Sequence, residues 1–357
     1  MIHDDAPVLT ERAGGTGRIT LNRPRALNAL TPPMVRAIDH ALTAWERDDT
    51  LTAVVLTGAG ERGLCAGGDI RLIHQEASGG GSGEATAAFW RAEYRLNARI
   101  ARYPKPYVAL MDGIVMGGGI GVSAHGSLRI VTERSAVAMP ETGIGLVPDV
   151  GGTWLLSRAP GELGTHLALT GRTVGAADAI LCGLADHCVP SAQLPALMAA
   201  LAGPDVPDAA AVRETVLRYA TAPPRGRLDA DRAWIDACYA ADTVEEIAER
   251  LLADRRQPAK DTAHTLATRS PTALKATLAA LRRARETATL EEVLDQEYRS
   301  SCAAFTFPDL VEGIRAQVID KDRTPRWSPK ELTEVTDADV GRFFTRPPGG
   351  DLGLGSP

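Results

Sequence analysis

The chain has 357 residues, a hydrophobic fraction of 44% and a formal net charge of −6. A single hydrophobic core stops growing at roughly 250–300 residues, so we expect one large domain and a smaller one. The acidic balance argues against nucleic acid as a partner, because proteins that bind nucleic acid present a basic stripe. A local cluster of arginine and lysine could still bind a small anionic ligand.

The cysteines and the N-terminal segment predict a cytoplasmic protein. The five cysteines form no CxxC pair, which favours reduced intracellular thiols over a zinc ribbon or a redox pair. The first residues, MIHDDAPVLTER, are acidic and lack the apolar run of a secretory signal. The apolar segment Tyr107–Ala124 carries Asp112 and several glycines, so we interpret it as buried backbone near a site rather than a membrane span.

The N-terminal region predicts a hairpin, a helix and a strand. Val8–Arg12 and Arg18–Asn22 flank a glycine-rich turn, as in a β-hairpin. A helix should begin at Thr31-Pro32-Pro33, with threonine as N-cap and the prolines in the first turn. The apolar, β-branched run Thr52–Thr57 then predicts a buried strand.

Strands and helices continue to alternate in the middle of the chain. Tyr107–Met111 predicts a strand and Gly113–Gly119 a loop. Ile120–His125 predicts a short helix, and Leu128–Thr132 the next strand. This alternation indicates an α/β fold with parallel strands.

Strand signals end near residue 200. Pro271–Arg285 and Leu290–Ala304 predict two helices, and the sequence before them has helical periodicity. We therefore expect residues 1–200 to form the core and residues 201–335 a helical region. The tail, residues 336–357, should be partly disordered because its end is rich in glycine and proline.

Two glycine-rich loops each follow a predicted strand and precede helical sequence. They are Gly63–Asp69 and Met116–Gly121. Free N–H groups at helix N-termini attract negative charge, so two such loops could aim two donors at one thioester oxygen and form an oxyanion hole. Tight turns without a ligand are the alternative. A pyrophosphate site is disfavoured, because no GxGxxG motif opens a predicted helix and a Walker A motif is absent.

Five segments together resemble the crotonase superfamily of acyl-coenzyme A (acyl-CoA) enzymes. In chain order they are Leu21–Pro24 with Ala26–Leu30, Cys65–Asp69, Gly117–Gly119, Met139–Thr142 and Gly151-Gly152. The resemblance implies an α/β fold whose core of repeated ββα units forms a spiral and binds acyl-CoA, followed by a helical C-terminal region. It also implies an oxyanion hole made by the amides of Gly68 and Gly118, and a homo-oligomer, either a trimer or a hexamer.

The residues at two further positions separate the subgroups of this superfamily. Its hydratases use two glutamates around a water, and here the first of these positions is Gly121 while the second is Glu141. Asp149 stands where hydratases usually carry a small residue. The missing carboxylate at Gly121 and the additional carboxylate at Asp149 resemble the pattern of the 3-hydroxyisobutyryl-CoA hydrolase group. The resemblance implies that Glu141 and Asp149 are catalytic, with Glu141 either activating water or attacking the carbonyl.

The rest of the chain resembles the same hydrolase group. The matching C-terminal motifs are Ser270–Thr272, Glu297–Arg299, Glu312–Arg315, Ile319–Asp322 and Trp327–Pro329. Phe89–Tyr94 resembles a glutamate-containing helix of the group, which implies that Glu93 binds the acyl part of the substrate. The expected substrate is 3-hydroxyisobutyryl-CoA, cleaved to 3-hydroxyisobutyrate and CoA in valine catabolism.

Each singled-out residue has a simpler interpretation as well. Glu93 could be a surface charge, and Asp149 could cap a helix that begins near Gly151. Arg23 and Arg25 could pair with CoA phosphates, although exposed arginines are common. For Asp69 and Cys65 we favour structural roles. Asp69 is expected to be an N-cap, and Cys65 is expected to be a small core residue that has no histidine to activate it.

Two other function classes compete with thioester hydrolysis. A hydratase or isomerase of a short enoyl-CoA would need only the oxyanion hole and Glu141, and Gly121 weakens that interpretation. A non-catalytic CoA-binding protein is disfavoured because both Glu141 and Asp149 are present. The seven histidines show no metal or triad pattern, so we expect no metal site and no cofactor beyond the CoA of the substrate. The expected partner is an acyl-CoA, with no nucleic acid and no membrane.

Overall fold

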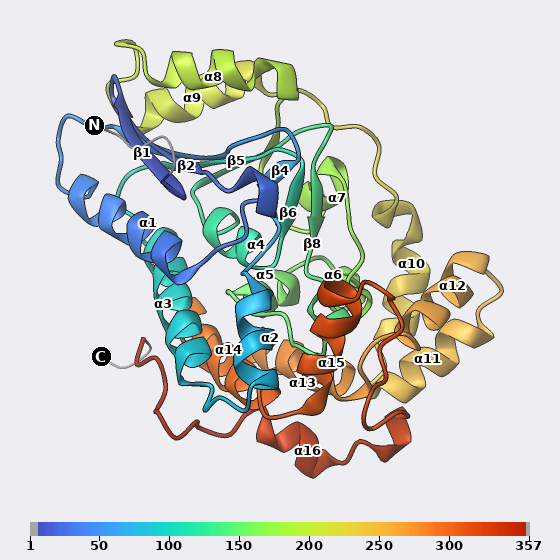
Figure 1. The fold of residues 1–357 in the computed structure, drawn as a ribbon. Helices are drawn as coiled ribbons and strands as arrows, with labels where there is room; N and C mark the ends of the chain where they lie inside the picture. Colours follow the sequence, from blue (N-terminus) through green and yellow to red (C-terminus); the bar gives the residue numbers. More distant parts are fainter. Residues whose placement is uncertain (1–5, 355–357) are drawn as a thin grey trace. The chain divides into compact units, whose positions relative to one another are not determined.

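The computed structural model describes residues 6–354. The chain folds into two compact units and passes between them several times. The first unit comprises the residues up to 68, residues 95–137 and residues 174–226. The second comprises residues 69–94, residues 138–173 and the residues from 227 onward. Figure 1 shows the elements coloured along the sequence, and their α/β content confirms the predicted fold class.

The first unit contains the strands and several short helices. Its strands are β1 (Val8–Ala13), β2 (Thr16–Leu21), β3 (Ala53–Gly58), β4 (Gly63–Cys65), β5 (Tyr107–Met111), β6 (Ile114–Met116), β7 (Leu128–Val131), β8 (Ala136–Ala138) and β9 (His187–Cys188). Its helical segments are η1 (Pro24–Ala26), α1 (Pro32–Trp45), α4 (Gly118–Ser123), α7 (Ala176–Leu181), η3 (Ser191–Gln193), α8 (Leu194–Leu201) and α9 (Ala209–Tyr219).

The strands form two sheets in the described part of the chain. The larger has the order β1-β2-β3-β5-β7-β9, and all its pairs are parallel except β1 with β2. That antiparallel pair, with Val8 opposite Leu21, confirms the predicted hairpin. The smaller sheet has the order β4-β6-β8. Strand β6 lies inside Gly113–Gly119, so the prediction of a plain loop there was wrong: three residues are too few to show strand alternation.

Helices α8 and α9 lie side by side along the larger sheet (Figure 1). Val55, Leu110 and Ile130 of the sheet share one hydrophobic cluster with Leu197 and Val216 of these helices. Complete burial of such side chains contributes roughly 1.5–3 kcal/mol each. This face of the sheet is therefore closed by sequence that follows the last strand.

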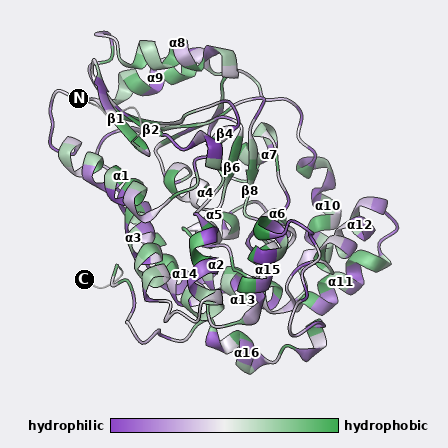
Figure 2. Cartoon of the chain, viewed as in Figure 1, coloured by the Kyte–Doolittle hydropathy of each residue, from purple (hydrophilic) through white to green (hydrophobic). Residues whose placement is uncertain are grey.

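The second unit is mainly helical. Its elements are α2 (Ile70–Ser78), α3 (Glu84–Ala101, whose last turns belong to the first unit), η2 (Glu141–Ile144), α5 (Gly152–Ser157), α6 (Leu163–Thr170), α10 (Leu228–Tyr239), α11 (Val244–Ala253), α12 (Gln257–Leu266), α13 (Pro271–Glu286), α14 (Leu290–Ala304), α15 (Pro308–Ile314), the π-helical η4 (Arg315–Ile319), η5 (Leu332–Glu334) and α16 (Asp337–Arg342). Helices α13 and α14 match the two predicted from the sequence. Figure 2 shows hydrophobic and hydrophilic residues alternating along α11, the pattern of a helix with one buried face.

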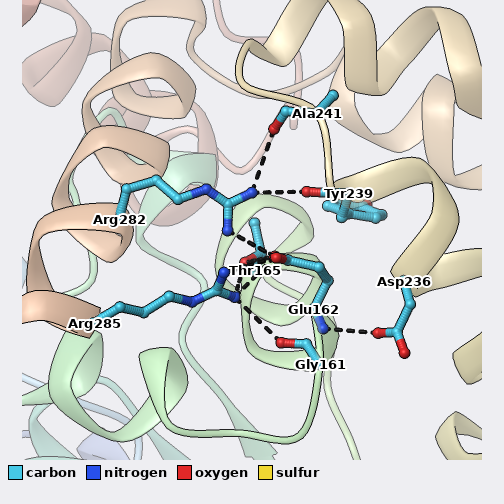
Figure 3. Close-up of polar contacts among 8 residues, drawn as sticks. All are labelled: Gly161, Glu162, Thr165, Asp236, Tyr239, Ala241, Arg282 and Arg285. Carbon is cyan, nitrogen blue, oxygen red and sulfur yellow. Dashed lines mark hydrogen bonds and ion pairs between the residues drawn. The ribbon is translucent and has the colours of Figure 1, made fainter.

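A carboxylate clamp joins three helices of the second unit (Figure 3). Glu162, just before α6, accepts hydrogen bonds from Arg282 and Arg285 of α13, at 2.7–2.9 Å. Its backbone N–H donates to the Asp236 carboxylate of α10 at 2.8 Å. Partial burial alone would raise the pKa of Glu162, but the hydrogen bonds from Arg285, Thr165 and Arg282 hold it below its usual range. The clamp fixes α6, whose far end borders a cavity considered below.

The C-terminal segment is packed as far as the structure describes it. Phe343 and Leu352 are 1% and 2% exposed, and the Asp351 carboxylate pairs with Arg299 at 2.7 Å. These contacts fall within the range for which the sequence predicted partial disorder. Residues 355–357, and residues 1–5 of the predicted leaderless N-terminus, lie outside the described residues.

No helix within residues 6–354 is long and apolar enough to span a bilayer. The apolar segment Tyr107–Ala124 consists of β5, β6 and most of α4, as expected for buried backbone.

Candidate active site

The two glycine loops lie against each other in the first unit. Gly67 has a φ of 113°, and a Cβ there would lie 3.3 Å from the Met116 carbonyl oxygen. A Cβ on Gly119 would lie 2.4 Å from the Cys65 carbonyl oxygen, closer than any side chain allows. Glycine is therefore required for this approach, which brings the loops carrying Gly68 and Gly118 together.

Helix α4 begins at Gly118, so the Gly118 N–H has no acceptor within the helix. All residues of α4 are buried, including Gly121, which adds no carboxylate to this segment. Cys65 is fully buried in β4, in agreement with its interpretation as a core residue. Asp69 is the N-cap residue of α2, although its side chain makes no capping hydrogen bond.

A buried asparagine fixes the turn before the first glycine loop. Asn28 has a left-handed φ of 55°, and its Nδ2 donates to the carbonyl oxygens of Ala59 and Gly63 at 3.0 and 3.1 Å. Arg23 Nη1 donates to the Ala29 carbonyl at 2.6 Å, so part of this side chain stabilises the same turn. Arg25 is exposed. Binding of CoA phosphates by these two arginines stays a prediction.

The three predicted carboxylates are buried in the second unit. Glu93, Glu141 and Asp149 are 2%, 5% and 6% exposed. The alternative of Glu93 as a surface charge therefore fails. Glu93 Oε1 and Glu141 Oε2 have no hydrogen-bond partner among the described residues. Unpaired carboxyl oxygens at such burial are costly, and they are typical of groups that await a substrate.

Glu141 is the first residue of the short 3-10 helix η2, which packs against α15. Gly145 ends η2 with a φ of 74°, and a Cβ there would lie 2.5 Å from the backbone of Asp309. A Cβ on Gly313 of α15 would lie 2.5 Å from Ile144. These two glycines let α15 pack directly against the turn, which explains the placement of the Glu312–Arg315 motif.

Asp149 lies in a tight turn before α5. The turn places Val150 at a φ of 53°, a conformation that β-branched residues rarely adopt. The Tyr94 hydroxyl of α3 donates to Asp149 Oδ2 at 2.5 Å and contacts Ser301 Oγ of α14 at 2.7 Å. The capping alternative for Asp149 was wrong, because Gly151 is the N-cap of α5 and no side chain of the turn caps it.

Glu297 of α14 takes over the capping role. Its carboxylate accepts hydrogen bonds from the N–H of Gly151 at 2.6 Å, from the N–H of Thr153 at 2.8 Å and from the Thr153 hydroxyl at 2.6 Å. The sequence analysis assigned Glu297 no role at the site. Its only signal was its motif with Tyr298 and Arg299.

Burial shifts the ionisation of all four carboxyls. Burial, and then the charge of Asp149, raises the pKa of Glu93 and of Glu141 well above the usual range. Burial raises the pKa of Asp149 to about 6 despite the hydrogen bond from Tyr94. Burial also raises the pKa of Glu297 to about 8, although the hydrogen bonds from Thr153 and Gly151 lower it. Groups that titrate near neutral pH can act as general acids and bases.

Neighbouring carboxyls with separated pKa values can divide the roles of acid and base. The cluster of Glu93, Glu141 and Asp149 therefore suits proton transfer or attack on a carbonyl carbon. Across residues 6–354, no group of three or more His, Cys, Asp or Glu is arranged to hold a metal ion.

Comparison with known proteins decides the family. A family model described as enoyl-CoA hydratase/isomerase matches residues 16–344. The chain belongs to this family. It is 43% identical to the mitochondrial 3-hydroxyisobutyryl-CoA hydrolase of Rattus norvegicus over 96% of this chain and 89% of the relative. The human enzyme of that name is also 43% identical, over 96% of this chain and 90% of the relative.

Two solved structures match nearly the whole chain. A carnitinyl-CoA dehydratase from Mycobacterium thermoresistibile is 50% identical with a TM-score of 0.92, over 99% of this chain and 100% of that one. An enoyl-CoA hydratase from Rhodobacter sphaeroides 2.4.1 is 45% identical with a TM-score of 0.89, over 97% and 99%. Both confirm the crotonase-like fold.

The relatives confirm the predicted family and the predicted enzyme class, a thioester hydrolase acting on acyl-CoA. The predicted cytoplasmic location was wrong, because the named relatives from rat, mouse and human are mitochondrial proteins. Neither a secretory signal nor disulfide pairing separates the cytoplasm from another reducing compartment.

Proposed function

We propose that this enzyme hydrolyses a short 3-hydroxyacyl-CoA thioester, with 3-hydroxyisobutyryl-CoA as its main substrate in valine catabolism. The observation that carries the proposal is the interacting pair of buried carboxyls, Glu141 and Asp149. Relatives named 3-hydroxyisobutyryl-CoA hydrolase, 41–43% identical to the chain, support this choice of substrate.

In the proposed reaction the amides of Gly68 and Gly118 receive the thioester oxygen as it takes on negative charge. Glu141 removes a proton from water, the resulting hydroxide attacks the carbonyl carbon, and the carbon–sulfur bond breaks. In the covalent route, Glu141 attacks instead and water then hydrolyses the mixed anhydride. In both routes the CoA thiolate leaves and takes up a proton.

The other two carboxyls contact the acyl part in this proposal. Asp149, held by the Tyr94 hydroxyl, receives the 3-hydroxyl of the substrate or passes a proton. Glu93 orients the acyl chain through its unpaired Oε1. Tyr94 follows Glu93 on α3, so the same helix positions both groups.

A lyase is the second candidate, and the names of the two matching solved structures favour it. Addition of water to a double bond in this family uses a second glutamate at the position of Gly121. The structure has only buried backbone of α4 there. This difference favours hydrolysis over hydration.

A thiol assay separates the two candidates. We expect rapid release of free CoA thiol from 3-hydroxyisobutyryl-CoA and slow release from isobutyryl-CoA, which lacks the hydroxyl. With crotonyl-CoA, the absorbance of the conjugated enoyl group should stay constant. Rapid loss of that absorbance without thiol release would replace the hydrolase proposal by the lyase.

Several expectations stay predictions alongside this function. They are the absence of a cofactor, assembly into a trimer or hexamer, and the division of the chain near residues 200 and 335. The family implies the acyl-CoA substrate.

A further inference from the structure

A cavity of about 520 Å³ lies in the second unit. It is bordered by the end of α6 and the turn after it, by one face of α12, and by two single residues. The lining residues are His166, Thr170, Gly171, Arg172, Thr173, Arg227, Pro258, Asp261, Thr262, Thr265 and Arg269. None of Glu93, Glu141, Asp149 and Glu297 lines it, so the proposed function makes no use of this space.

The cavity wall has an excess of positive charge. Three arginines and a single acidic residue, Asp261, line it. The Asp261 carboxylate accepts a hydrogen bond from Gln257 at 2.8 Å, and none of the ion pairs within residues 6–354 joins it to a lining arginine. The guanidinium groups of Arg172 and Arg269 are half-buried, and neither forms an ion pair with a carboxylate in the described part of the chain, which favours the binding of an anion.

Arg269 is rigidly placed at this wall. Its Nε and Nη2 donate to the Thr170 carbonyl oxygen at 2.9 and 2.5 Å, and its Nη1 would lie 3.3 Å from a Cβ on Gly143. Burial lowers the pKa of Arg269, and no carboxylate offsets this cost. A bound anion would supply the missing negative charge.

Arg172 lines the same cavity as Arg269 and is less constrained. The structure shows no hydrogen bond or ion pair from its guanidinium group in the described part of the chain, and its side chain is half-buried. The charge of Arg172 reaches His166, where burial and then this charge lower the pKa of the imidazole to about 3. The ring is therefore neutral at physiological pH.

His166 adds an unpaired polar atom to the cavity lining. Its ring is fully buried, Nδ1 shares a hydrogen bond of 3.0 Å with the Tyr239 hydroxyl, and Nε2 has no partner among the described residues. When Tyr239 donates to Nδ1, Nε2 carries the proton and is a donor without an acceptor. A buried polar atom without a partner is the second indication that the cavity holds a ligand.

We propose that this cavity is a binding site for a phosphate-bearing anion, held by Arg172 and Arg269. Guanidinium groups match phosphate oxygens with two parallel hydrogen bonds. The volume accommodates a group as large as a pyrophosphate or a nucleoside diphosphate. Free phosphates and nucleotide phosphates share this chemistry, so both are probes.

Calorimetric titration of the full-length protein tests the site, with sodium pyrophosphate and adenosine 3′,5′-bisphosphate as the two probes. We expect at least one probe to bind with a Kd below ~1 mM at low salt, and Arg172→Gln to weaken that binding at least ~10-fold. Arg255→Gln is the matched control. Arg255 is an exposed arginine of the same unit that does not line the cavity, so its variant loses the same charge and should bind like the wild type.

The outcomes are separable. Binding of pyrophosphate that Arg172→Gln weakens indicates a site for free phosphates. Binding of the bisphosphate alone indicates one for nucleotide phosphates if Arg172→Gln weakens it, because the acyl-CoA site can also bind this part of CoA. No binding of either probe below ~1 mM overturns the proposal. Equal affinity in wild type and Arg172→Gln overturns it too, as does an equal loss in Arg172→Gln and Arg255→Gln, since that indicates nonspecific charge. Melting curves of both variants verify that they are folded.

Discussion

Glu141 has an unpaired carboxyl oxygen at 5% exposure, and Asp149 raises its pKa further. Such a group destabilises the free enzyme, because its charged form is poorly solvated and lacks donors. A substrate or a water molecule that donates to this oxygen removes the cost. Poor solvation in the free enzyme and reactivity toward a bound thioester therefore have the same physical origin.

The first prediction concerns Glu141→Gln. We expect kcat for 3-hydroxyisobutyryl-CoA to fall by at least ~10²-fold, because removal of a general base or nucleophile typically costs ~10²–10⁴-fold. The melting temperature should rise, since the variant no longer buries an ionisable group. Thiol release and calorimetric melting measure the two effects. Turnover close to that of the wild type would remove Glu141 from the catalytic group.

At the scale of elements, the decisive contact joins α14 to the start of α5. Val150 has a positive φ, a conformation that costs roughly 1–3 kcal/mol and that the surrounding structure must hold in place. Glu297 does so from the other side of the turn, through the N–H groups of Gly151 and Thr153. It thereby positions Asp149.

Glu297→Gln tests this positioning role. A glutamine has one acceptor oxygen in place of two, so one buried N–H loses its partner at a cost of ~1–3 kcal/mol. We expect kcat to fall ~10-fold or more for 3-hydroxyisobutyryl-CoA and less for isobutyryl-CoA, because only the former uses Asp149. A merely structural role would lower both rates equally.

Glu292→Gln is the matched control on the same helix. Glu292 is exposed and forms a capping box with Thr289, so its loss should cost ~1 kcal/mol at most. Its kcat on both substrates should equal that of the wild type. A loss of selectivity in this control would show that general loosening of α14, rather than Glu297, sets the geometry.

For the whole molecule, the buried carboxyls make stability depend on pH. Asp149 has a folded pKa of about 6 against an ordinary value of 3.8. Below this ordinary value the Asp149 carboxyl is protonated in both the folded and the unfolded protein, so its ionisation does not lower the stability of the fold. As pH rises through 6, the unfolded chain has already ionised while the folded chain must ionise in a buried place, and stability is lost.

Asp149→Asn should reverse this loss. The amide oxygen can still accept from Tyr94, but the group no longer ionises. We expect the free energy of unfolding of the variant, minus that of the wild type, to grow by about 3 kcal/mol between pH ~3 and ~8. Urea denaturation at several pH values measures this difference. A difference that is constant across pH would mean that Asp149 is ionised at its ordinary pKa in the folded protein.

Local pattern in the sequence was enough for a large part of the molecule. The hairpin of β1 and β2, the strand β5 and the helices α13 and α14 agree with the prediction because turn residues, caps and apolar spacing act over a few positions. The family was also readable from the sequence, since its motifs are short runs around glycines and Glu141. Strand β6 was missed because its pairing with β4 lies far along the chain.

Only the tertiary structure decided how the catalytic candidates are held. Tyr94 reaches Ser301 across 207 positions, and Glu297 reaches Gly151 across 146, so no window of sequence contains both partners. The same holds for Glu93: its local sequence fits both a surface charge and a substrate contact, and only packing shows that the side chain is buried. The sequence by itself determined which chemical groups the chain carries and where its local elements begin. Burial and long-range hydrogen bonds, which depend on the whole chain, decided which of those groups have raised pKa values and which ones position the others.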